Sequence, residues 1–323
     1  MITTPLSNLK PYPLSKDKYK VKNWRSYNEG LKNRGSLTVW IEEGVANGWK
    51  HTQQGKAKRG GQCSYSNLAI QTCLMLRKVY GLPLRQTEGF IKSIFKLAGI
   101  IMPVPDYTTL CRRSNGLKVN LSVASKGEVT DIVVDSTGLK VYGEGEWKVR
   151  KHGAGKHRTW MKLHIAANSE SQQIEAVTLT TNAVTDATEA EALLRQIDRP
   201  VRNFYGDGAY DKDKVRKPLC KKGIKQIIPP QRNAVPDKRK SGHRAERDAA
   251  IGSIKEQGRD AWKKQQGYHQ RSKAETAMFR YKTIIGGNLS ARKLEHQKAE
   301  VEIGCKILNI MLQLTKPQSV KVA

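Results

Sequence analysis

The chain has 323 residues, and its 58 Lys and Arg against 29 Asp and Glu give a net charge of +29 at pH 7. An excess of this size is typical of a protein that binds nucleic acid. The most apolar late stretch, residues 299–314, contains charged side chains and is too short to span a membrane, which excludes an integral membrane protein. Five scattered cysteines provide neither a disulfide framework nor a zinc pair, so we expect a cytoplasmic protein, and the length suggests two or three domains.

Residues 1–35 are predicted to form an extended basic arm. They contain three prolines, and every second residue from 16 to 22 is lysine. Beyond this arm, apolar residues recur at helical spacing from Ser36, over about 66–80 and over about 85–97.

Residues 36–125 are therefore predicted to form a helical DNA-binding region of the helix-turn-helix kind. Its last helix opens at Asp106, directly after a proline, and carries Arg112 and Arg113. These arginines could enter the major groove of DNA. An ordinary helical bundle with cationic edges explains the same pattern, and the two interpretations remain open.

The pattern changes near residue 129, where β-branched runs begin to alternate with polar turns. The predicted order is β-β-β-α-β-α-β, with a hairpin added after the first strand. This order indicates an α/β domain over residues 126–290, closed by a helix over about 260–282. The basic, polar segment 229–258 is predicted to be a surface insertion, and residues 291–323 a C-terminal helix and tail.

Two aspartates follow apolar strands of this predicted sheet. Asp135 ends the run Ile-Val-Val, and Asp207 ends another strand between two glycines, so both are expected at the rim where α/β active sites collect. Each could instead be an ordinary turn aspartate. Asp186 is interpreted differently, as the cap of a helix.

A third carboxylate, Glu275, lies on the predicted helix over about 260–282. If this helix is regular, Tyr268, Arg271, Glu275 and Lys282 fall within an arc of about 60°. A solvated charged face is the usual explanation of such a run, but small and apolar neighbours indicate that this face borders the core. The three carboxylates together suit Mg²⁺, and two such ions catalyse phosphodiester chemistry. Arg271 and Lys282 could then hold DNA phosphates.

The residues Tyr268, Arg271, Glu275 and Lys282 reproduce the signature Tyr-x₂-Arg-x₃-Glu-x₆-Lys, in which the chain resembles the DDE transposases of bacterial insertion sequences. The blocks DSTGLKVYGEGEWKVRKHG, DGAYD and GYHQRSKAETAMFRYKT are similar to the insertion-sequence-five family, in its nine-oh-three-like subgroup, and the likeness extends over nearly all of the chain.

This resemblance implies a ribonuclease-H-like (retroviral-integrase-like) catalytic core. Asp135, Asp207 and Glu275 would be its catalytic and metal-binding residues, with two Mg²⁺ ions for which Mn²⁺ substitutes. It implies that the protein cleaves the ends of a mobile element and transfers the 3′-hydroxyl ends into target DNA. The expected partners are terminal inverted repeats, target DNA and at least one further copy of the chain, in a bacterial cytoplasm.

Trp147 lies in the predicted hairpin with Lys148 and Arg150, where it could stack on an unpaired base. Packing in a core is the commoner role of a lone tryptophan. Two other functions also remain open. One is a captured, non-catalytic repressor, which has no need of the carboxylates. The other is a structure-selective nuclease on the same fold.

Overall fold

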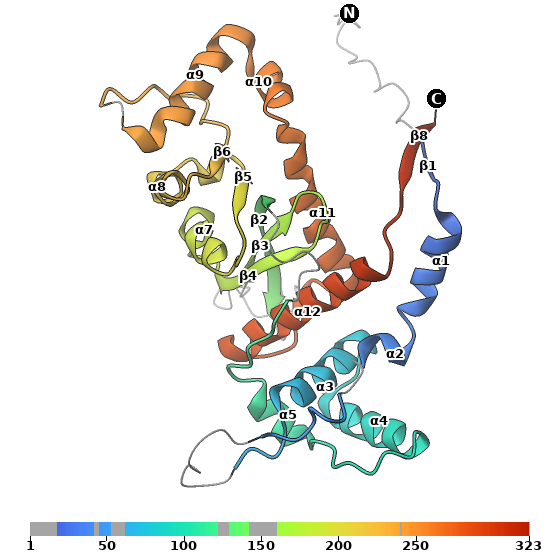
Figure 1. The fold of residues 1–323 in the computed structure, drawn as a ribbon. Coiled ribbons are helices and arrows are strands. Elements are labelled where there is room, and N and C mark those ends of the chain that lie inside the picture. The colour runs from blue at the N-terminus through green and yellow to red at the C-terminus, as the bar shows by residue number, and fades with distance from the viewer. Residues whose placement is uncertain are drawn as a thin grey trace, which may run out of the picture.

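The computed structural model describes residues 18–41, 45–52, 62–121, 129–141, 160–239 and 241–322. Trp147, Lys148 and Arg150 lie outside these ranges. Within them, no helix has the length and apolar character needed to cross a membrane. The described chain contains a central sheet with helices on both faces and a separate group of N-terminal helices (Figure 1).

The central sheet is mixed and has the strand order β4-β3-β2-β5-β6. Strand β2 lies in the middle, antiparallel to β3 and parallel to β5, and the two-residue strand β7 (Asn288–Leu289) pairs with its end. The predicted order β-β-β-α-β-α-β is confirmed. The strands are β2 (Thr130–Val141), β3 (Trp160–Asn168), β4 (Ile174–Thr181), β5 (Val201–Tyr205) and β6 (Lys225–Ile227).

Strand β2 is longer than predicted, because it continues through the Ser-Thr-Gly segment where a turn into a hairpin was expected. Gly138 allows this. A Cβ atom at this position would lie 3.1 Å from the ring of Trp160, so the strand passes close beneath an aromatic side chain. Asp135 is consequently in the interior of β2 rather than at its end.

Helices cover the two faces of the sheet. On one face, α7 (Asp186–Arg195) and α8 (Asp213–Lys221) enclose a core that includes Ile132, Val134 and Phe204. The other face packs against α11 (Ser272–Arg280) and α12 (Leu294–Leu314) through a second core.

The N-terminal helices have their own apolar core, below the sheet in Figure 1. They are α3 (Asn67–Val79), α4 (Leu84–Leu97) and α5 (Tyr107–Arg113), as predicted, and Asp106 caps α5 by accepting from the N–H groups of Thr108 and Thr109. Helix α12 belongs to both cores. It gives Ala299, Ile303, Ile307 and Met311 to the helical core, and Val301, Cys305 and Leu308 to the sheet core. The helical region and the sheet are therefore joined through α12.

The predicted extended arm is wrong from residue 18 onward. Strand β1 (Lys18–Val21) pairs with the C-terminal strand β8 (Ser319–Val322), and α1 (Trp24–Asn33) follows. Strand β1 is ordered by its pairing with β8, at the other end of the described chain. Local sequence patterns do not reveal a pairing between such distant segments. The helix predicted from Ser36 is only the short α2 (Leu37–Trp40).

The predicted surface insertion is also wrong in its second half. Helix α9 (Ala245–Gln257) buries Ala250 and Ile251, and Ala250 joins the sheet core. The helix predicted over about 260–282 is broken into α10 (Arg259–Gln265), a 3₁₀ turn (Tyr268–Arg271), α11 and a π-helical turn (Tyr281–Ile285). Gly267, at φ 63°, separates the first two.

Candidate active site

Asp135 and Asp207 occupy corresponding positions on adjacent parallel strands. Val133 of β2 pairs with Tyr205 of β5, and this is the last pair between these strands. Each aspartate lies two residues beyond its member of that pair. Because side chains alternate along a strand, Asp135 points to the same face as Val133, which is the face covered by α11.

Both aspartates are held by local backbone hydrogen bonds. The N–H of Ser136 donates to Asp135 Oδ1 at 2.9 Å, and the N–H of Ala209 donates to Asp207 Oδ1 at 2.8 Å. Such bonds to nearby backbone N–H groups are typical of a turn aspartate. The role of ordinary turn aspartates, which the sequence left open, therefore applies to both residues in part. Each carboxylate keeps further lone pairs for other ligands.

The 3₁₀ turn before α11 and α11 itself bring Arg271 and Glu275 to this face. The guanidinium of Arg271 pairs with Glu275, four residues later, and its Nη2 lies 3.6 Å from Asp135 Oδ2. Arg271 therefore links the helix carboxylate to the strand carboxylate.

The electrostatics confirm that the acidic side chains act on one another. Burial raises the pKa of Asp135, the Ser136 N–H and Arg271 oppose this rise, and the charges of Asp207 and Glu275 add to it. Asp135 and Asp207 are thus partly buried, Glu275 is exposed, and Arg271 contacts both Asp135 and Glu275. Such a site favours the arrival of a cation.

These carboxylates are not assembled into a ready metal cage. In the described part of the chain, no group of three or more His, Cys, Asp or Glu side chains is arranged to hold a metal ion. The chemistry of the donors nevertheless fits Mg²⁺, which takes oxygen ligands, keeps several waters and commonly uses one or two carboxylates together with substrate phosphates.

The other two residues of the signature lie on either side of α11 in irregular turns. Tyr268 is half-buried beside Trp262, with ring centroids 6.1 Å apart, and burial raises the pKa of its phenol. Lys282 is exposed in the π-helical turn. The single regular helix face predicted for all four residues is therefore wrong, because the 3₁₀ and π turns change the rotation per residue.

The two arginines predicted to contact DNA from α5 differ in their surroundings. Arg113 donates to the carbonyl oxygen of Tyr65 and to Asn67 Oδ1, each at 2.7 Å, so its guanidinium holds α5 against the start of α3. Arg112 is exposed and donates to Thr109 Oγ1 at 3.2 Å.

Sequence reasoning missed a polar cluster on the opposite face of the sheet. Asp186 does not cap α7, because Thr185 occupies the cap position. Asp186 Oδ1 instead lies 3.2 Å from Lys162 Nζ and 3.7 Å from Nδ1 of the buried His164. Tyr210 lies close to this cluster, and burial, followed by the charges of Asp186, Asp135 and Asp207, raises its pKa. In the sequence, the available signal for this cluster was the run DGAYD, which brings Asp207 and Tyr210 within three residues of each other.

These observations define the class of the protein. It is an α/β protein with three acidic side chains grouped on one face of its sheet. Two family models, each described as Transposase DDE domain, match residues 32–144 and 127–310. The second spans more than half of the chain and contains Asp135, Asp207 and Glu275. The protein belongs to the DDE transposase family. That membership implies cleavage of DNA with the use of divalent metal ions, typically Mg²⁺.

Among solved structures, the chain is similar to one described as the cryo-EM structure of piggyBac transposase synaptic complex with hairpin DNA. The match covers 89% of this chain and 78% of that chain, with 11% sequence identity and a TM-score of 0.37.

Proposed function

We propose that this protein binds the terminal inverted repeats of its element, cleaves phosphodiester bonds at the element ends and transfers the resulting 3′-hydroxyl ends into target DNA. We further propose that it belongs to the insertion-sequence-five group and acts as a dimer or larger assembly, because two ends must be held together before joining.

One observation carries the catalytic part of this proposal. Asp135 and Asp207 each lie two residues beyond the last residue pair between β2 and β5. Arg271 contacts both Glu275 and Asp135 and so links the two carboxylates. Two partly buried aspartates and the exposed Glu275 thus come from separate segments of the chain to one face of the sheet. A non-catalytic repressor has no use for this arrangement, since grouped carboxylates repel DNA phosphates.

Asp135, Asp207 and Glu275 would hold two Mg²⁺ ions. When bound, the ions activate the attacking oxygen and stabilise the leaving oxygen of the phosphodiester. Arg271 contacts both Asp135 and Glu275 and would hold them close together before the ions bind. Lys282 is exposed beside α11 and would contact a phosphate flanking the scissile bond.

The strand order supports a ribonuclease-H-like assignment for the catalytic region. The three antiparallel strands β2, β3 and β4 are extended by the parallel strands β5 and β6. Asp135 lies on β2, and Asp207 lies two residues beyond the end of β5.

The proposal is tested by incubating the purified protein with Mg²⁺, a plasmid and a labelled duplex that carries the inverted repeat flanking the gene. We expect nicking at the element end followed by joining of the labelled strand to plasmid. Nicking without joining would identify a structure-selective nuclease, and specific binding without nicking would identify a repressor.

A further inference from the structure

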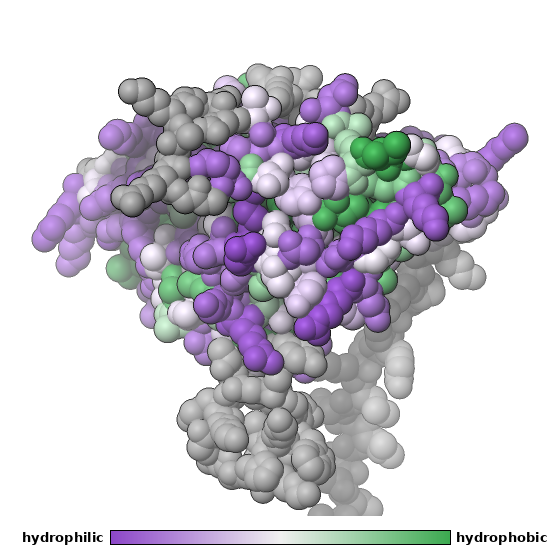
Figure 2. Space-filling model, turned by 90° about the horizontal axis from the view of Figure 1, so that it is seen from below, coloured by the Kyte–Doolittle hydropathy of each residue, from purple (hydrophilic) through white to green (hydrophobic). Residues whose placement is uncertain are grey.

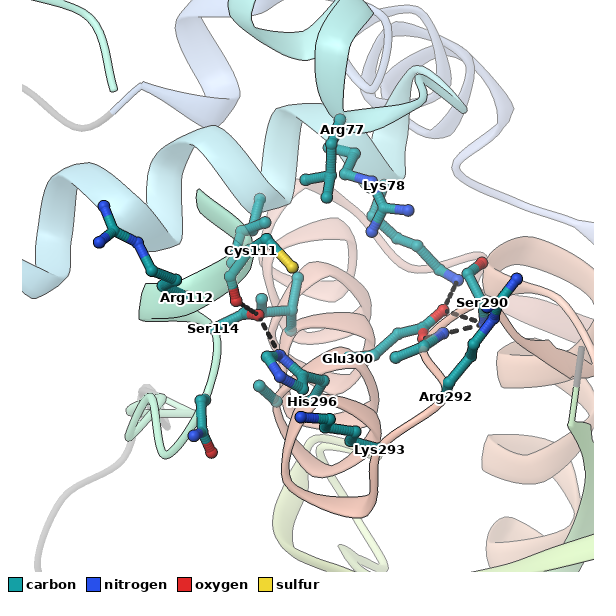
Figure 3. A pocket seen from close by; sticks show the side chains of 16 residues that line it. Arg77, Lys78, Cys111, Arg112, Ser114, Ser290, Arg292, Lys293, His296 and Glu300 are labelled. Carbon is teal, nitrogen blue, oxygen red and sulfur yellow. Dashed lines mark hydrogen bonds and ion pairs between the residues drawn. The ribbon is translucent and has the colours of Figure 1, made fainter. Parts of the chain in front are cut away.

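A cleft of about 590 Å³ lies between the N-terminal helices and the start of α12. One wall consists of α3 and α5, and the other consists of residues 290–293 and the first turns of α12 (Figure 3). The volume is in the range of ligand-binding sites. One wall is helical, and the other combines a bend with the beginning of a helix.

The cleft is strongly cationic. Its basic side chains are Arg77, Lys78, Arg112, Arg292 and Lys293. Glu300 is the one carboxylate among the described lining residues, and it is already engaged. It accepts from Lys78 Nζ at 3.0 Å and from the backbone N–H groups of Ser290 and Ala291.

The four remaining cations have no carboxylate partner in the part of the chain that the structure describes. Across the described ranges, no carboxylate forms an ion pair with Arg77, Arg112, Arg292 or Lys293, and the buried Nε of Arg77 has no hydrogen-bond partner there. Like charges facing each other across a fixed cleft repel one another. The binding of an anion relieves this repulsion.

Two contacts fix the distance between the walls. Ser114 Oγ donates to the carbonyl oxygen of Cys111 at 2.8 Å, so it must accept from His296 Nδ1, at 2.6 Å, because a hydroxyl carries a single proton. This bond joins α5 to α12. The Lys78–Glu300 ion pair joins α3 to α12 in the same way (Figure 3).

We propose that this cleft binds consecutive backbone phosphates of one DNA strand at the element end, with Arg112 on one wall and Arg292 and Lys293 on the other. The inference rests on the proposed function and adds the segment before α12 to the DNA-binding surface. Arg112 lies on the helix for which a major-groove role was predicted. The face seen from below, where the N-terminal helices lie, is largely hydrophilic, with smaller hydrophobic areas (Figure 2).

The test compares two double variants that remove equal charge. Arg292→Gln/Lys293→Gln alters the cleft, whereas Lys217→Gln/Lys221→Gln alters exposed lysines on α8, on the far side of the sheet domain. The cleft variant should lower the slope of log affinity against log salt by about two units, because each phosphate contact contributes about one. The control should change it by much less. Unchanged thermal melting of both variants excludes misfolding as the cause.

A methylphosphonate scan of the element end locates the contact. Neutralising one or two consecutive phosphates should weaken binding by the wild-type protein and cause no further loss with the cleft variant. Additive losses at every position, or a cleft variant that behaves like the α8 control, would overturn the inference. If the wild-type protein cuts element ends normally in that case, the proposed function stands without this site. If the wild-type protein neither binds nor cuts ends, both fail.

Discussion

Arg271 joins two carboxylates from different parts of the fold, since its guanidinium pairs with Glu275 on α11 and lies 3.6 Å from Asp135 on β2. The sequence suggested that this arginine holds phosphate. In the structure it contacts Asp135 and Glu275, so we expect its contribution to catalysis to include positioning these carboxylates for metal binding.

The first prediction contrasts Arg271 with Lys282. Arg271→Ala should lower the cleavage rate by at least about ten-fold, with little loss of end affinity, and higher Mg²⁺ should restore part of the rate. Lys282→Ala should weaken end binding and gain nothing from added metal. Cleavage rates and end affinities measured across a Mg²⁺ titration check both variants. A loss in Arg271→Ala that no Mg²⁺ concentration relieves would contradict the positioning role.

A second prediction concerns stability. Burial disfavours the ionised form of Asp135 in the folded state, and Asp207 and Glu275 add to this cost. Asp135→Asn should therefore raise the melting temperature in EDTA by about 1–3 °C while abolishing cleavage. Mg²⁺ should raise the melting temperature of the wild-type protein more than that of the variant. A variant that melts lower in EDTA would show that the site is not under electrostatic strain.

Acid sensitivity should depend on His164. Burial lowers the pKa of His164 to about 4, so the unfolded chain takes up the proton first as pH falls below about 6.5. The stability that the neutral imidazole contributes is complete above that pH and is lost progressively toward pH 4. Urea unfolding at pH 7.5 and 5.0 should show a loss about 2 kcal/mol larger for wild type than for His164→Asn. Equal losses would mean that the pKa of His164 is the same in the folded and the unfolded protein.

The basic segment 229–258, which was predicted to be a surface insertion, should contribute in part to the stability of the fold. Arg247 Nε lies 3.2 Å from Oδ1 of the buried Asp211, whereas Lys238 is exposed. Arg247→Ala should lower the melting temperature by a few degrees, because it removes a partner from a buried carboxylate. Lys238→Ala should leave the melting temperature unchanged and weaken non-specific DNA binding slightly. Melting curves and filter binding of the two variants, side by side, decide this.

Local sequence patterns correctly predicted the features that depend on neighbouring residues, such as strands and the start of a helix. The apolar run before Asp135 and the glycines around Asp207 placed both residues beside buried strands, and Asp106 marked the start of α5. The pairing of Val133 with Tyr205, which aligns the two aspartates, involves residues far apart in sequence and required the structure.

The remaining errors have the same origin. The pairing of β1 with β8 depends on two segments at opposite ends of the described chain. Helix α9 packs on the sheet core through Ala250, and the polar residues around Ala250 in the chain gave no indication of this contact. Arg247 lies in the segment predicted to be a surface insertion, and its partner Asp211 lies on a distant segment, so local patterns did not reveal their contact. A C-terminal helix was predicted, but the contribution of α12 to two cores was not.

The central claim is that Asp135, Asp207 and Glu275 hold the metal ions that cut DNA. Cleavage of a labelled element end by Asp135→Cys and Asp135→Asn, in Mg²⁺ and in Mn²⁺, tests it most directly, because a thiolate ligates Mn²⁺ better than Mg²⁺. We expect both variants to bind the end and to be inactive in Mg²⁺, and only the cysteine variant to recover cleavage in Mn²⁺. Either variant cutting at more than a few percent of the wild-type rate in Mg²⁺ would contradict the claim.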